Sequence, residues 1–191
     1  MNHIRLEKKG LRGLAIAESF RETDTTSKLA GIVMRRDFVI DGFVFGHAKI
    51  EGDDSTESIL AMYDKLNRQD ISFLLISGLI ISMYNIVDIK KLSKECNMPV
   101  IGVTYEESTG IEDAIKHHFP NSYESKVKQY RNLGTRIKIE LHTGYDLYLR
   151  VEGCETGEAK RLLDAFTLQG AIPEPLRVAH LLARAELDLT S

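Results

Sequence analysis

Over the first part of the chain, apolar side chains recur in short runs that are rich in β-branched and aromatic residues. These runs cover residues 11–18, 28–36 and 38–50, and only short polar segments separate them. Such runs are typical of β-strands, and the short connections predict an antiparallel meander of three strands. The period then changes, because apolar residues follow at helical spacing behind the polar start at Ser55. This pattern predicts a helix over residues 55–67.

The middle of the chain predicts two parallel strands. Residues 71–76 are almost continuously apolar, as in a strand that is buried on both faces of a sheet. Residues 87–96 carry apolar side chains at helical spacing, and residues 99–105 form a second apolar run. A strand, a helix and a strand in this order form the crossover that places two strands parallel.

The last part of the chain predicts helices around a short hairpin. Residues 135–141 and 145–151 alternate with period two on either side of a turn at Gly144, and we expect this hairpin as an appendage to the main sheet. Helices are expected over residues 110–118, 122–132, 156–168 and 175–186. The last helix follows Pro173, and its apolar face is expected to pack onto the sheet or onto a second subunit.

Together these elements predict an α/β fold with a mixed sheet. Three antiparallel strands are followed by parallel strands, helices flank the sheet, and a hairpin and helices are added at the C-terminal end. The chain has 191 residues, and a chain of this length can bury about 70% of the surface that it exposes when unfolded. We therefore treat residues 1–191 as one domain.

The composition limits the expected cellular compartment and the kinds of binding partner. The 25 Lys and Arg residues nearly balance the 28 Asp and Glu residues, so a nucleic-acid partner would need a local basic patch. Cys96 and Cys154 are too few and too far apart for a disulfide framework or a structural zinc site. No segment reaches the roughly 18 apolar residues of a membrane span. We therefore expect a cytoplasmic protein without a membrane partner.

Three stretches of the chain resemble the endonuclease dU family, an archaeal family with similarity to endonuclease V. They are residues 41–57 with the run GDDSTE, residues 77–89 with the run NIVDI, and residues 170–180 with the run IPEPLRVAH. The last run is the most specific of the three. The resemblance implies a ribonuclease-H-like fold and metal-dependent cleavage of DNA or RNA near a deaminated base such as deoxyuridine, as in DNA repair.

The acidic residues depart from the pattern that this resemblance implies. In the family, carboxylates at the ends of central strands hold Mg²⁺ or Mn²⁺, which activate water and stabilise the leaving oxygen. Ala17 and Glu18 stand where the family has a pair of aspartates, and Ser77 stands where it has another. A serine hydroxyl carries no charge and is a weaker metal ligand. The remaining candidates for catalysis and metal binding are Glu18, Asp53 and Asp54, with Mg²⁺ or Mn²⁺ expected only in an active enzyme.

Asp53 and Asp54 have a second interpretation. They precede the predicted helix at residues 55–67, where acidic residues form turns and cap free backbone N–H groups. Glu18 is equally explained as a solvated residue at the end of the first strand.

One segment is clearly basic. Between residues 114 and 139, six cations stand against the single acid Glu124: Lys116, Lys126, Lys128, Arg131, Arg136 and Lys138. We expect phosphate contacts from Lys126, Lys128 and Arg131, together with Arg177 of the C-terminal run. The alternatives are a solvated helix face for the basic segment and, for Arg177, an ion pair with the nearby Glu174.

Two functions therefore remain open. The first is an endonuclease with an incomplete carboxylate set, acting on DNA or RNA. The second is a module of the same fold without catalysis, which binds nucleic acid or self-associates as a homodimer.

Overall fold

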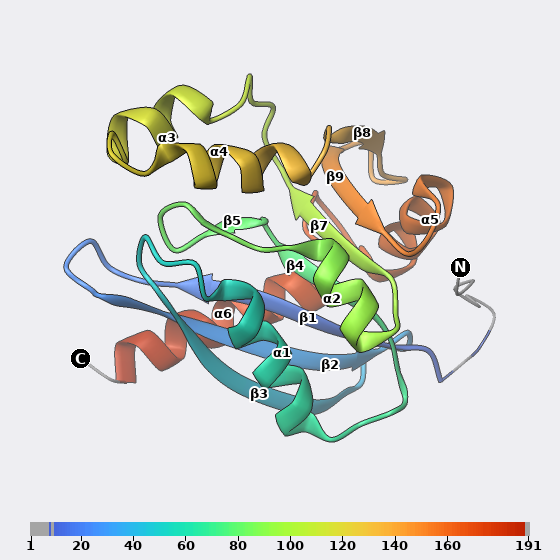
Figure 1. Cartoon of the computed structure of the whole chain (residues 1–191). Coiled ribbons are helices and arrows are strands. Elements are labelled where there is room, and N and C mark those ends of the chain that lie inside the picture. The colour runs from blue at the N-terminus through green and yellow to red at the C-terminus, as the bar shows by residue number, and fades with distance from the viewer. Residues whose placement is uncertain (1–7, 9, 190–191) are drawn as a thin grey trace.

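The computed structural model describes residue 8 and residues 10–189, which fold around a mixed sheet of seven strands (Figure 1). The strands lie in the spatial order β3-β2-β1-β4-β7-β9-β8. Their bounds are Arg12–Ser19 (β1), Thr26–Arg35 (β2), Ile40–Lys49 (β3), Ile71–Ser77 (β4), Val100–Thr104 (β7), Ile137–Glu140 (β8) and Asp146–Glu152 (β9). The helices are Ser55–Leu66 (α1), Ile89–Cys96 (α2), Glu112–His118 (α3), Tyr123–Asn132 (α4), Thr156–Phe166 (α5) and Glu174–Leu189 (α6). Each strand and helix that the sequence predicts is present.

The strand directions confirm the predicted mixed sheet. β1, β2 and β3 form the antiparallel meander, and β4 pairs parallel to both β1 and β7. Within the described residues, no helix is both long and apolar enough to cross a membrane.

The C-terminal hairpin belongs to the main sheet, which it extends by two strands. β9 pairs antiparallel with β7 over five residues, from Val100 opposite Glu152 to Thr104 opposite Tyr148. Leu147 and Leu149 of β9 are fully buried in the cluster that includes α5. The expected appendage is therefore continuous with the sheet, because its apolar side chains and its backbone groups both find partners there.

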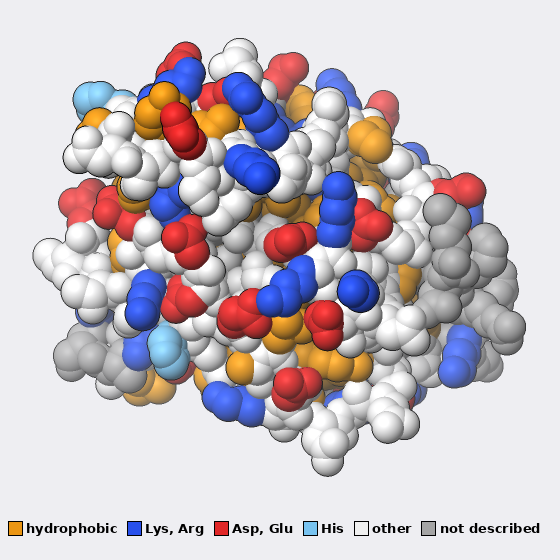
Figure 2. Space-filling model, in the orientation of Figure 1, with side chains coloured by type: hydrophobic (Ala, Val, Ile, Leu, Met, Phe, Trp, Pro, Cys, Tyr) orange, Lys and Arg blue, Asp and Glu red, His pale blue; other side chains and the backbone are white. Residues whose placement is uncertain are grey.

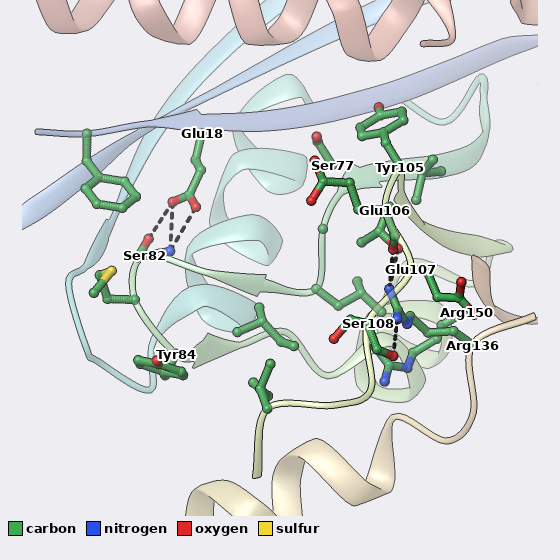
Figure 3. Close-up of a pocket in the computed structure, with 18 residues that line it drawn as sticks. Glu18, Ser77, Ser82, Tyr84, Tyr105, Glu106, Glu107, Ser108, Arg136 and Arg150 are labelled. Atoms are coloured by element: carbon green, nitrogen blue, oxygen red, sulfur yellow. Dashed lines mark hydrogen bonds between the residues drawn. The ribbon is translucent and has the colours of Figure 1, made fainter. Parts of the chain in front are cut away.

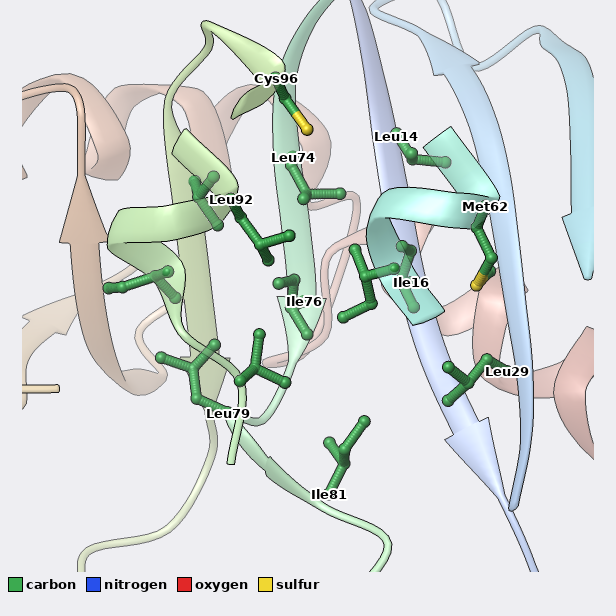
Figure 4. Close-up of a cluster of buried hydrophobic side chains, with 14 of the residues drawn as sticks. Leu14, Ile16, Leu29, Met62, Leu74, Ile76, Leu79, Ile81, Leu92 and Cys96 are labelled. Carbon is green, nitrogen blue, oxygen red and sulfur yellow. The ribbon is translucent and has the colours of Figure 1, made fainter. Parts of the chain in front are cut away.

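Different helices cover the two faces of the sheet, because strand side chains alternate between faces. Leu14 and Ile16 of β1 join a cluster with Met62 of α1, on the face that α2 also covers (Figure 4). Ala15 and Ala17 point the other way, into the cluster beneath α5 and α6. α6 crosses β1 and β2 on this second face.

The segment that follows β4 forms a wall of the candidate site. The parallel strands β1, β4 and β7 end at the same edge of the sheet, and the chain turns over this edge as a short hairpin, β5 (Ile80–Ile81) and β6 (Asn85–Ile86). The sequence did not predict this hairpin, because each of its strands has only two residues. Its turn residues have left-handed φ angles: 46° at Ser82, 55° at Met83 and 68° at Tyr84.

Left-handed backbone costs roughly 1–2 kcal/mol for each such residue. Three side chains of the segment, Leu79, Ile81 and Ile86, are buried in the cluster beneath α1 and α2. Burial of an aliphatic side chain contributes about 1.5–3 kcal/mol, so the anchors offset the strained turn.

Candidate functional site

A pocket of about 620 Å³ opens where the parallel strands end (Figure 3). Glu18, Ser77 and Tyr105 line it from the ends of β1, β4 and β7, and the hairpin β5–β6 and the loop after β7 form its walls. We call this cavity the Glu18 pocket. A neighbouring cavity of about 320 Å³ shares Glu18 and Ser77 and is closed by His180 of α6. Glu18 therefore lies at the junction of the two cavities.

Ser82 holds the Glu18 carboxylate in place. The backbone N–H of Ser82 lies 2.9 Å from each carboxylate oxygen, and the Ser82 hydroxyl donates to Oε2 at 2.8 Å. The Ser82 hydroxyl is also hydrogen-bonded to the Ser27 hydroxyl, at 2.5 Å. Burial raises the pKa of Glu18, and the bonds from Ser82 oppose that rise. Neutral donors, rather than a cation in direct contact, thus fix this carboxylate.

Ser77 occupies the end of β4, at a position where the resemblance predicts an aspartate. Its neighbour across the pocket is Tyr105, whose hydroxyl is buried without a hydrogen bond of standard geometry. Burial raises the pKa of Tyr105 to about 12, although Ser77 acts to lower it. Both side chains are therefore uncharged at neutral pH.

Ala17 stands at the other position where the resemblance predicts an aspartate. Its side chain is buried in the apolar cluster beneath α6, and it lines neither cavity. An aspartate here would place a charge among apolar side chains, which is costly without a partner.

Asp54 lies directly before α1, and one oxygen of its carboxylate accepts two short hydrogen bonds. It accepts hydrogen bonds from the backbone N–H of Lys49 at 3.0 Å and from the amide of Asn85 at 2.7 Å. Asp54 occupies the position before α1, but its side chain caps no N–H of that helix. The predicted turn is present, and its carboxylate links β3 to the hairpin β5–β6.

Asp53 lies on the other side of this turn and pairs with a buried lysine. Its Oδ1 is 3.1 Å from the ammonium of Lys126, and it lines a separate cavity of about 200 Å³ between α1, α2 and α4. The structure therefore does not bring Glu18, Asp53 and Asp54 together into the three-carboxylate group that the sequence predicts. Among the described residues, no group of three His, Cys, Asp or Glu side chains is close enough to hold a metal ion. The hairpin β5–β6 supplies neutral donors to two of these carboxylates, from Ser82 to Glu18 and from Asn85 to Asp54.

The side chains at the Glu18 pocket do not fit a resident Mg²⁺ or Mn²⁺. These cations take several oxygen ligands and favour carboxylates. At the ends of β1 and β4 the donor set is Glu18, already bonded to Ser82, and the neutral hydroxyl of Ser77. Glu106 and Glu107 also line the pocket, but among the described residues they form no group of three possible ligands with Glu18.

Lys126 is not available to phosphate, contrary to the sequence prediction. Its side chain is only 7% exposed, and its ammonium lies 2.8 Å from the carbonyl of Gly52, 3.1 Å from Asp53 and 3.2 Å from the carbonyl of Tyr84. An ammonium has three N–H donors, and three acceptors surround this one. Lys126 therefore joins α4 to the turn before α1 and to the hairpin β5–β6.

The other predicted phosphate contacts differ in their partners. Arg131 is exposed but forms a two-point ion pair with Glu112, at 3.0 and 2.6 Å. Arg177 pairs with Glu174 at 2.7 Å, which confirms the predicted ion pair. Lys128 is exposed, and no ion pair of the described residues involves it.

Nearby acids pair with four of the six cations in the basic segment. Lys116 pairs with Asp113 and Lys138 pairs with Asp146. On the face shown in Figure 2, blue and red side chains are interspersed rather than gathered into one basic surface. Charge alone therefore marks no nucleic-acid face here.

Sequence reasoning missed four residues of the site. His180 stood within the IPEPLRVAH run, which was the one available signal for it. Tyr105 and Arg150 carried no local signal, because tertiary contacts bring them to the pocket. Arg136, known only as part of the basic segment, donates to the carbonyls of Glu106 and Ser108 at 3.0 and 2.8 Å and so holds the pocket wall (Figure 3).

Comparison with known proteins gives one family and one fold. A family model described as Endonuclease dU matches residues 9–186. A UPF0215 protein of Pyrobaculum aerophilum is 36% identical over 173 residues, which cover 90% of this chain and 92% of that protein. A UPF0215 protein of Archaeoglobus fulgidus is 28% identical over 183 residues, covering 93% of this chain and 94% of that protein.

Solved structures share the architecture. A protein of unknown function from Archaeoglobus fulgidus superposes with a TM-score of 0.80 at 26% identity, over 93% of this chain and 98% of that one. Human ENDOV superposes with a TM-score of 0.66 at 14% identity, over 98% of this chain and 88% of that one. Endonuclease V of Ciona intestinalis, solved with a 24mer DNA containing an inosine, has a TM-score of 0.65 at 14% identity, covering 97% of this chain and 89% of that one. The mixed sheet flanked by helices is thus similar to that of endonuclease V and of ribonuclease-H-like folds.

Proposed function

Because this chain belongs to the Endonuclease dU family, we propose that it binds nucleic acid at the Glu18 pocket and accommodates there a deaminated base such as the uracil of deoxyuridine. In this proposal the protein does not hydrolyse the phosphodiester bond with a resident Mg²⁺ or Mn²⁺. The observation that carries it is the state of Glu18: its carboxylate is bonded to Ser82, and Ser77 stands beside it in place of a second acid.

The shape and chemistry of the pocket support a base-sized ligand. Its volume of about 620 Å³ lies within the range of roughly 300–1,000 Å³ that is usual for small-molecule sites. Apolar side chains such as Leu79 and Val103 line it, with aromatic rings from Phe20 and Tyr84. Proteins that act on bases turn them out of the stack, place them against apolar or aromatic side chains and read them by hydrogen bonds.

The backbone of the nucleic acid would be held by a few cations. Lys128 is exposed and forms none of the ion pairs among the described residues, so it can contact a phosphate directly. Arg131 and Arg177 would first have to exchange a carboxylate partner for a phosphate. We therefore expect salt-sensitive binding with a small number of phosphate contacts.

The family name favours a second candidate, a metal-dependent endonuclease. The test of both is an anisotropy titration and a cleavage assay on the same fluorescein-labelled oligonucleotides, single- and double-stranded, with uracil or thymine at one position. Mn²⁺ is added in the cleavage arm. We expect the wild type to bind the uracil-containing strand in a salt-dependent manner without strand breaks.

Three variants sharpen this test. Ser77→Phe fills the pocket and is expected to weaken binding about tenfold, through the loss of the base contact. Ser77→Asp adds a second carboxylate beside Glu18, and cleavage by this variant alone would identify Ser77 as the missing metal ligand. Cleavage by the wild type that Glu18→Gln abolishes would replace the proposal with the second candidate. Absence of binding to every oligonucleotide would contradict both.

A further inference from the structure

β3 lies at one end of the sheet, and only one of its edges is paired. β2 pairs with it antiparallel along nearly its whole length, whereas no described strand pairs with its other edge (Figure 1). With ten residues it is a long edge strand. Natural proteins usually shorten or block such edges, because unpaired N–H and C=O groups favour pairing with another strand.

The outward backbone groups of β3 can be assigned from its pairing with β2. The N–H of Ile50 donates to the carbonyl of Thr25, so by alternation the even-numbered residues from Gly42 to Ala48 bond β2 and the odd-numbered residues between them point outward. Side chains close both ends of this outward edge. At one end, Arg68 donates to the carbonyl of Asp41. At the other end, the backbone N–H of Lys49 donates to the Asp54 side chain, and its carbonyl accepts from the Asn85 side chain.

Three residues between these ends keep their outward backbone groups without a described partner. They are Phe43, Phe45 and His47, each with one N–H and one C=O. Phe43 and Phe45 are also unusually exposed for phenylalanine, at 55% and 40%. Their side chains lie on the face opposite to α1, and α6 covers β1 and β2 there rather than β3. Exposed aromatic side chains beside free backbone groups mark an interaction surface.

We propose that β3 pairs antiparallel with β3 of a second copy of this chain, with Phe45 opposite Phe45 on the two-fold axis. Outward residues must face outward residues, so only a few registers are allowed. With Phe45 at the centre, Phe43 faces His47 of the other copy, and all three free residues of each strand are used. Each of the three facing residue pairs forms two backbone hydrogen bonds, so the two strands form six hydrogen bonds in total. A shift of the register by one residue at the axis leaves at least one of these residues without a partner.

The charges at the two ends of the edge are complementary in this arrangement. In this register Asp41 stands opposite Lys49 of the other copy, so an acidic and a basic side chain meet at each end of the paired strands. Antiparallel pairing brings each end beside the opposite end of the other copy. A two-fold dimer needs such a self-complementary surface. The interface does not involve the Glu18 pocket, because no residue of β3 lines that cavity.

The test is the oligomeric state, measured by sedimentation equilibrium. We expect a monomer–dimer equilibrium for the wild type. Phe45→Lys places two like charges opposite each other on the axis and is expected to raise the dimer dissociation constant by at least about 30-fold. Tyr145→Lys changes another exposed aromatic side chain, on the distant β8–β9 hairpin, and is expected to leave the constant unchanged.

Disulfide cross-linking tests the register independently of the charge variants. Residues in a hydrogen-bonded antiparallel pair have Cα atoms about 5.5 Å apart, within the range of a disulfide. Phe45→Cys should therefore cross-link to itself on mild oxidation. Phe43→Cys should cross-link only when mixed with His47→Cys. The wild type is the control, since burial raises the pKa of Cys96 to about 11 and that of Cys154 to about 12.

Two results would overturn the proposal. One is a wild type that stays monomeric at the highest soluble concentration while Phe45→Cys fails to cross-link. The other is a dimer whose dissociation constant is the same for Phe45→Lys and Tyr145→Lys, because such a dimer uses another surface. Neither result affects the nucleic-acid proposal, which is tested at a different site.

Discussion

The Glu18 pocket and the turn at residues 52–54 are two neighbouring acidic regions with opposite surroundings. At the turn, Asp53 pairs with the buried ammonium of Lys126. Asp54 accepts hydrogen bonds from the backbone N–H of Lys49 and the side-chain amide of Asn85. In the pocket, Glu18 meets only neutral donors and faces a cavity. The difference shows how to separate the two roles of an acid. A carboxylate that pairs with a buried ammonium stabilises the fold, whereas one that only neutral donors contact at the wall of the larger cavity remains available to a ligand.

The largest loss of stability is expected when the Lys126 side chain at the turn is replaced. Lys126→Met removes the ammonium that donates to the partly buried carbonyls of Gly52 and Tyr84, and it removes the partner of Asp53. We expect the free energy of unfolding to fall by about 2–4 kcal/mol, measured by urea denaturation. Lys128→Met is the matched control on the same helix, and its change is expected to stay within about 0.5 kcal/mol. Equal effects of the two variants would show that Lys126 does not hold the turn.

A smaller effect is expected at the contact between Ser82 and Glu18. Ser82→Ala removes the hydroxyl bonds to Glu18 and to Ser27 but keeps the backbone N–H that also binds Glu18. We expect a loss of about 1–2 kcal/mol in unfolding free energy. Because the lost bond favoured the ionised form, the pKa of Glu18 should rise further in an NMR titration. The exposed Ser125→Ala serves as the control, and an unchanged Glu18 pKa in Ser82→Ala would contradict the assigned contact.

The smallest effect is the pH dependence that Glu18 contributes. Burial raises its pKa above the ordinary value of 4.5, so the folded protein holds this proton more tightly than the unfolded chain does. The stability of the wild type relative to Glu18→Gln should therefore be greatest below pH 4.5, fall as the pH rises towards the folded pKa, and stay constant above it. Urea denaturation over a pH series measures this difference. A difference that grows with rising pH would mean that the pocket favours the charged carboxylate.

Much of the fold could be predicted, because its signals are local. The continuous apolar run at residues 71–76 and the alternation at residues 145–151 each report the environment of one strand. The hairpin β5–β6 could not be predicted, since its strands are too short to show a period and its turn uses ordinary residues in left-handed conformations.

The candidate site was predicted only in part. Glu18 was found because it ends the first strand beside a family-like pattern, and the pair of Arg177 with Glu174 was found because the two are neighbours in sequence. Lys126 was misassigned, since a run of lysines and arginines reads the same whether each ammonium faces water or a buried acceptor.

The sequence by itself determined the order and type of the main elements, the mixed character of the sheet and the likeness to one family, because these depend on residue patterns within short windows. Only the tertiary structure decided which carboxylate pairs with a buried ammonium and which is held by neutral donors. Ser82 reaches Glu18 across 64 positions of the chain, and Lys126 reaches Asp53 across 73. Contacts between residues so far apart depend on how the sheet and its connections pack, and no local pattern carries that information.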